Sequence, residues 1–114
     1  MVLREIRIKK EELRKRIEGL SDIERYLSKK GSVLEGVVAG IDEAEGLLFT
    51  TMVHSEKNKE DILKYRIKEE EKLIKRWEDY TSEKDYRSRG RLAGLKYVLF
   101  LHINTKYQKV GEKK

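Results

Sequence analysis

The sequence has no cysteine and no proline, and only one tryptophan among its 114 residues. The absence of cysteine excludes disulfides, thiolate metal sites and cysteine nucleophiles. The absence of proline means that no residue forces a helix to kink or stop. The ends of secondary-structure elements must therefore be predicted from serine and glycine.

Long hydrophobic runs are also missing. The longest apolar stretch, residues 92–103, is interrupted by Lys96 and is shorter than the roughly 20 residues that a membrane-spanning helix needs. The first ten residues are charged from Arg4 onward, without the apolar segment of a secretory signal. These features predict a soluble, cytoplasmic protein without a membrane partner. The length suits one core, so we expect a single domain over residues 1–108 and a frayed basic tail over 109–114.

Charged residues make up 42% of the chain and hydrophobic residues 38%, so the apolar residues must be concentrated on particular helix faces if the chain is to fold. Lysine and glutamate are abundant, whereas Gln, Asn and Met are rare. This composition is the one expected of heat-adapted proteins with many surface ion pairs.

Serine and glycine divide the sequence into helices. Ser21 with Glu24 and Ser32 with Glu35 have the spacing of capping boxes, while Ser55 and Ser82 mark two further helix starts. Gly19 and Gly31 lie where C-terminal caps are expected. The predicted helices cover residues 2–19, 22–30, 33–54, 56–80 and 83–108. We therefore expect an all-α fold, an antiparallel bundle of four main helices and one short helix, with the 92–103 segment central and no internal repeat.

The N-terminal helix contains a heptad seam, in which apolar residues recur at alternating steps of three and four. Its apolar members are Leu3, Ile6, Leu13, Ile17, Leu20 and Leu27. A seam this narrow on a highly charged segment is typical of helices that pair with another helix. It is the candidate association surface, and the expected partner is a second copy or another protein.

Residues 33–54 have two interpretations. Many β-branched residues and three glycines favour a hairpin, but Leu34, Val37, Ile41, Ala44 and Leu48 recur at helical spacing. The helix is preferred because the segment between the possible strands has no two-residue hairpin turn.

In residues 56–80, one face of the predicted helix is apolar and carries Leu63, Ile67, Ile74 and Trp77. This pattern predicts that Trp77 is buried.

Motifs for catalysis, metals or nucleotides are lacking. The two histidines, His54 and His102, are not in a Glu-x-x-His motif, and no GxSxG or phosphate-binding glycine loop is present. A helical metal-dependent phosphohydrolase needs acids that point inward from two helices, and Asp42 with Glu45, and Glu71 with Glu78, are the acid pairs considered for that role. Glu69, Glu70 and Glu71 alternate with lysines, which predicts a solvated face of ion pairs. We therefore expect no cofactor, no metal and no small-molecule substrate.

Two glycine pairs, Gly36 with Gly40 and Gly90 with Gly94, are spaced four residues apart. They predict places where helices approach closely, because glycine has no side chain to hold two backbones apart.

Positive charge is concentrated at the C-terminal end, where residues 86–114 contain eight bases and one acid. Arg87, Arg91 and Lys109 fall near one side of a helix and are candidate phosphate contacts. The leading functional hypothesis is a non-enzymatic association or accessory module, possibly a homodimer. The alternative is a nucleic-acid-binding accessory protein that uses this basic helix, and a helical phosphohydrolase comes third.

Overall fold

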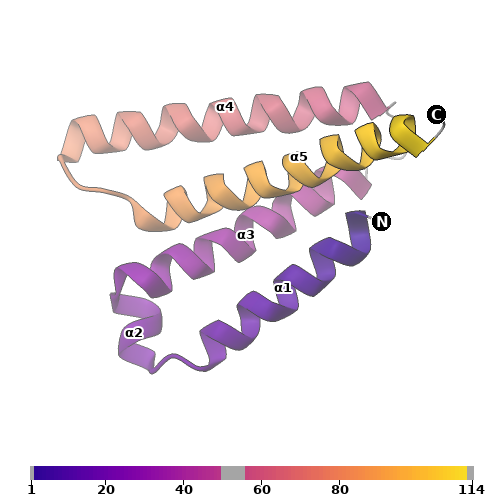
Figure 1. The fold of residues 1–114 in the computed structure, drawn as a ribbon. Coiled ribbons are helices and arrows are strands. Elements are labelled where there is room, and N and C mark those ends of the chain that lie inside the picture. The colour runs from indigo at the N-terminus through magenta and orange to yellow at the C-terminus, as the bar shows by residue number, and fades with distance from the viewer. Residues whose placement is uncertain (1, 50–55, 113–114) are drawn as a thin grey trace.

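A computed structural model describes the backbone of residues 2–49 and 56–112, and the side chains of residues 3–49 and 59–104. The described residues form helices throughout, connected by short turns (Figure 1). The helices are α1 (Val2–Glu18), α2 (Asp22–Leu27), α3 (Lys29–Phe49), α4 (Glu56–Thr81) and α5 (Tyr86–Glu112). The all-α bundle of four main helices and one short helix is thereby confirmed.

Helices α3 and α5 lie side by side at the centre and run in the same direction, while α1 and α4 flank them and run the opposite way (Figure 1). Helix α5 packs against α3, α4 and α1, which confirms the central position expected for residues 92–103. The helix prediction for the ambiguous segment is also confirmed over residues 33–49; residues 50–54 lie outside the described part of the chain.

The two glycine pairs bring α3 and α5 together. A Cβ atom added to Gly36 or Gly40 would lie closer than 3.0 Å to the α5 backbone at Arg87 or Arg91, and one added to Gly90 or Gly94 would meet α3 equally closely. The contact is reciprocal, because each helix places its glycines against carbonyl groups of the other. Backbones this close allow Cα–H···O contacts that side chains would prevent. The prediction that these glycines mark a close contact between helices is confirmed, and the two helices that meet there are α3 and α5.

The two helical hairpins, α1 with α3 and α4 with α5, are related by an approximate two-fold axis along the central pair. The glycine segments 36–41 (GVVAGI) and 90–95 (GRLAGL) occupy equivalent positions. Each outer helix packs mainly on the central helix of its own hairpin and less on the other. The inward positions also match, at 6, 10, 13 and 17 of α1 and at 63, 67, 70 and 74 of α4. The two hairpins are therefore similar in arrangement, although their sequences show no internal repeat.

The core lies around the α3/α5 contact and receives side chains from both flanking helices. Its most completely buried apolar members are Ile6, Ile41, Leu48, Leu63, Leu95 and Val98. Within the described residues, no helix combines the length and apolar character needed to cross a membrane.

The helix ends agree only in part with the predicted caps. Ser21 and Glu24 form the expected capping box at the start of α2. Ser32 lies inside α3 instead of capping it, because Ser28 accepts a hydrogen bond from the Gly31 amide and begins that helix. Gly31 is likewise buried within α3 and ends no helix. Ser55 lies outside the described residues.

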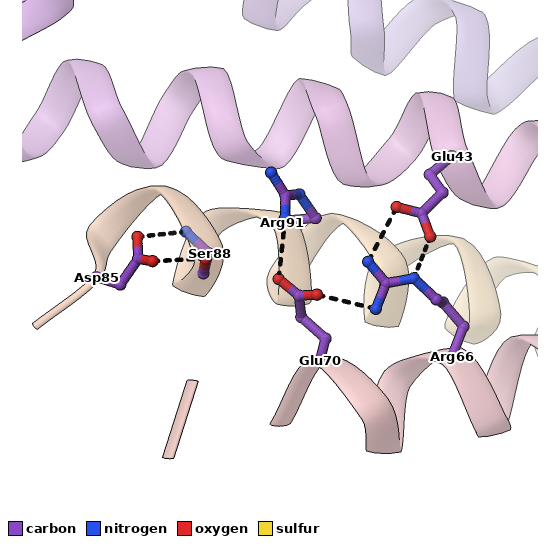
Figure 2. Close-up of polar contacts among 6 residues, drawn as sticks. All are labelled: Glu43, Arg66, Glu70, Asp85, Ser88 and Arg91. Carbon is purple, nitrogen blue, oxygen red and sulfur yellow. Dashed lines mark hydrogen bonds and ion pairs between the residues drawn. The ribbon is translucent and has the colours of Figure 1, made fainter. Parts of the chain in front are cut away.

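The start of α5 also differs from the prediction. Ser82 has a φ of 60° and does not cap α5; Asp85 does, accepting hydrogen bonds from the Ser88 amide at 3.0 Å and from the Ser88 hydroxyl at 2.8 Å (Figure 2). Burial of this carboxyl raises its pKa, but the two Ser88 hydrogen bonds, the charge of Arg91 and a hydrogen bond from the Arg87 backbone together lower the pKa of Asp85 below its usual value.

Candidate association surface

The N-terminal heptad seam packs within its own chain. Ile6, Leu13 and Ile17 are at most 4% exposed, since α1 lies against α3 and α5. Leu3 and Leu20 are partly buried. These residues therefore belong to the interior of the bundle, and only the last member of the seam, Leu27, is left on the surface.

Helix α2 carries that last residue on an exposed apolar face. Ile23, Tyr26 and Leu27 are 71%, 63% and 80% exposed, and none of the residues of α2 is buried. The guanidinium of Arg25 lies 5.1 Å from the Tyr26 ring centre. This face is short, because α2 has only six residues.

A longer apolar line follows the C-terminal half of α4. Leu73, Trp77 and Tyr80 are 53%, 49% and 87% exposed, and their spacings of four and three place them on one side of the helix. We call these three residues the α4 stripe. The predicted burial of Trp77 is wrong. At 100° per residue, Trp77 lies about 60° around the helix from Ile74, at the edge of the buried face.

Helix α4 is held in place by a network of four charged residues, shown in Figure 2. Arg66 donates to Glu43 of α3 and lies 2.8 Å from a Glu70 oxygen. Glu70 also accepts a hydrogen bond of 3.3 Å from Arg91 of α5. The network therefore ties α4 to both central helices at once.

The environment of Glu70 differs from the one that the sequence predicted. Glu70 is only 1% exposed, whereas the alternation of acids and lysines in the sequence predicted that this face of the helix is solvated. By the two-fold relation, Glu70 occupies the position that Leu13 has in the first hairpin, and Arg91 corresponds to Val37. A charged pair in the second hairpin thus replaces an apolar pair in the first.

The ion pairs of this network have a structural role, because they connect α4 to α3 and α5. Burial lowers the pKa of Arg66, but the hydrogen bonds to Glu43 and Glu70, together with the negative charges of these two residues, raise the pKa overall. Guanidinium groups do not release protons at physiological pH. The network therefore helps to fix the register of α4 against α3 and α5.

The candidate phosphate contacts are not gathered on one free surface. Arg87 is exposed, but Arg91 turns toward Glu70, and the side chain of Lys109 lies outside the described residues. The neighbouring Arg89 pairs with Glu78 of α4. Two arginines of this basic segment therefore neutralise acids of α4.

The acid pairs considered for a metal site are also engaged with bases. Lys10 donates to Asp42 at 2.7 Å and to Glu45 at 3.1 Å, and the hydrogen bond to Asp42 is the largest cause of the raised pKa of Lys10. Glu71 is exposed, and Glu78 binds Arg89. Over residues whose side chains are described, no group of three or more histidines or acids is placed to hold a metal ion. His54 lies outside these residues.

The hollows found on α4 are open and largely charged. One is lined by Lys72, Lys75, Arg76, Asp79 and Tyr80, and a second is lined in part by Glu71, Glu78 and Arg89. A small-molecule site typically encloses its ligand among apolar walls, so these hollows suit surface contacts better than substrate binding.

No protein-family model matches the chain, and comparisons with curated proteins and with solved structures found no significant match.

Proposed function

We propose that this chain is a non-enzymatic protein-association module and that the α4 stripe is its contact surface. The observation that carries the proposal is the exposure of Leu73, Trp77 and Tyr80 in one line, beside the face of the same helix that Leu63, Ile67 and Ile74 bury in the core. Tryptophan and tyrosine are enriched among the residues that dominate binding energy at protein interfaces. Charged side chains flank the stripe, as the polar rim of an interface does.

The way α4 is held also supports the proposal. Leu63, Ile67 and Ile74 anchor the helix in the core, and the network of Arg66 and Glu70 fixes it against α3 and α5. A surface on a rigid helix loses little conformational freedom when a partner binds. The shorter apolar face of α2 lacks such support, because none of its residues is buried.

The ion pairs of the basic segment favour association with protein over binding of nucleic acid. Arg89 and Arg91 already face carboxylates of α4, so a phosphate would have to compete with those acids. Arg87 has no such carboxylate partner in the described network. A single exposed arginine contributes little to phosphate binding, which depends on several charges acting together.

Site-specific photo-crosslinking tests the proposal in cells that express the chain. A photoreactive residue placed at Trp77 should form one protein adduct that mass spectrometry identifies. The matched control places the same residue at Lys75, which is exposed on the same helix but about 200° away from Trp77. Leu73→Lys in the chain that carries the probe at 77 should abolish the adduct. Equal labelling at both positions, or none at 77, would overturn the proposal.

A further inference from the structure

Helix α4 carries a line of basic side chains on the side that is turned away from the core. Lys64, Lys68, Lys72 and Lys75 are exposed, and their steps of four, four and three residues keep them on one side of the helix. Arg76 is also exposed and adjoins the line beside Lys72. We call these five residues the basic ridge. At 1.5 Å per residue, the ridge extends over about 16 Å of the helix.

The charges of the basic ridge are largely available to a partner. Among the residues whose side chains are described, Lys68, Lys75 and Arg76 form no ion pair. Lys72 lies 3.6 Å from Glu69, but both side chains are exposed, and exposed pairs of this kind contribute little energy. The ridge therefore differs from the basic segment of α5, in which two arginines are paired with acids of α4.

Two exposed tyrosines accompany the basic ridge. Tyr65 and Tyr80 are 66% and 87% exposed. At 100° per residue, Tyr65 lies about 20° around the helix from Lys72 and Arg76, and Tyr80 lies about 40° from Arg76. Tyr80 also lines a shallow hollow together with three members of the ridge and Asp79. Positive charge and accessible aromatic rings are therefore combined on one surface.

We propose that the basic ridge and its two tyrosines bind single-stranded nucleic acid. The lysines and Arg76 neutralise phosphates along the strand, while Tyr65 and Tyr80 each offer a flat ring on which an unpaired base stacks. A duplex keeps the faces of its bases inside its own stack, so the tyrosines favour a single strand. This inference goes beyond the proposed function, and Tyr80 is the one residue that the ridge surface shares with the α4 stripe.

The placement of the apolar residues disfavours a lipid surface as the anionic partner. Trp77 lies about 180° around the helix from Lys68, so a flat bilayer in contact with the ridge cannot take up the tryptophan. Membrane-surface helices, in contrast, insert an apolar face beside their basic residues.

Helix α1 has the larger excess of positive charge, with seven bases and four acids, but it contains no aromatic residue. Glu11 also lies between Arg4 and Lys15 on its exposed side. Helix α1 therefore lacks the combination found on α4 and provides an internal control.

The proposal is tested on the intact chain by the fluorescence anisotropy of a labelled oligothymidylate at several salt concentrations. The variant Lys72→Gln/Lys75→Gln/Arg76→Gln should lower the slope of log affinity against log salt by about 2, because each phosphate contact on a single strand contributes about 0.7. Tyr80→Ala should weaken binding by about fivefold or more with an unchanged slope, because it removes stacking but no charge. Asp79→Asn should tighten binding, since it removes the acid of the hollow.

The matched control is Arg7→Gln/Arg14→Gln/Lys15→Gln, which removes the same charge from exposed positions of α1 and should leave the slope unchanged. Equal loss of slope in both triple variants would mean that the net charge of the chain attracts the strand, and would refute the site. The proposal also fails if the wild type does not bind at about 50 mM salt, or if Tyr80→Ala binds as the wild type does. Displacement by polyglutamate as effective as that by unlabelled oligothymidylate would instead assign the ridge to an acidic protein partner.

Discussion

Leu13 and Trp77 both belong to helical apolar patterns, but their surroundings in the structure are very different. Leu13 is 4% exposed and contributes to the core cluster, whereas Trp77 is 49% exposed. Leu13→Ala should therefore lower the free energy of unfolding by about 2 to 5 kcal/mol. Trp77→Ala should lower it by only about 1 kcal/mol, since a half-exposed side chain loses less on truncation. Urea unfolding of both variants at low protein concentration measures the difference, and equal losses would contradict the assigned burial.

Glu70 shows that a residue can be charged and still belong to the interior. Glu70→Ala should cost about 3 kcal/mol, because it leaves the half-buried Arg91 and Arg66 without this partner. The double variant Glu70→Leu with Arg91→Val copies the apolar pair of the first hairpin. Replacing a buried ion pair by apolar residues of similar size is often neutral or stabilising, so this variant should be about as stable as the wild type. Thermal unfolding of the two variants side by side makes the comparison. A double variant less stable than Glu70→Ala would contradict the two-fold correspondence.

At the scale of the helices, the α3/α5 contact depends on glycine. Gly40→Ala should destabilise the fold by about 1 to 3 kcal/mol, the usual range for overpacking, because the added Cβ meets the Arg91 backbone. Gly46 provides a matched control on the same helix, where an added Cβ meets nothing within 4 Å. Gly46→Ala should stabilise the chain by up to about 1 kcal/mol through higher helix propensity. Chemical unfolding measures both changes, and a neutral Gly40→Ala would contradict the close backbone contact.

Much of this arrangement could be predicted from local sequence. The spacing of Leu34, Ile41 and Leu48 identified a helix despite three glycines, and Ser21 with Glu24 marked the start of α2. The glycine pairs predicted close helix contacts. Which helices they join could not be predicted, because spacing along one segment contains no information about its neighbour in space.

The candidate surface was harder to predict, for a physical reason visible on α4. This helix carries two overlapping apolar lines, one through Leu63, Ile67 and Ile74 and the other through Leu73, Trp77 and Tyr80. Both satisfy helical periodicity, and the positions of α3 and α5 decide which one is buried. The same limit applies to the N-terminal seam, whose periodicity indicates a helical partner but cannot tell whether that partner belongs to the same chain.

At the scale of the whole molecule, two similar hairpins meet along α3 and α5 but differ in what their outer helices present. Helix α1 has a net positive charge and buries its seam against the central pair. Helix α4 is neutral, is fixed by a buried ion-pair network and leaves an apolar stripe on its surface. The departure from two-fold symmetry therefore leaves an exposed apolar line on the outer helix of the second hairpin, and this line is the proposed contact surface.

Trp77 is the only tryptophan in the chain, so its fluorescence reports directly on the α4 stripe. The measurement is the emission maximum and its quenching by acrylamide at low protein concentration. We predict the emission maximum of a partly solvated indole and ready quenching, because Trp77 is 49% exposed. The Leu73→Lys variant should keep the solvated spectrum. A blue, weakly quenched emission would show that Trp77 is buried within the chain, and would contradict the assignment of the stripe as a contact surface.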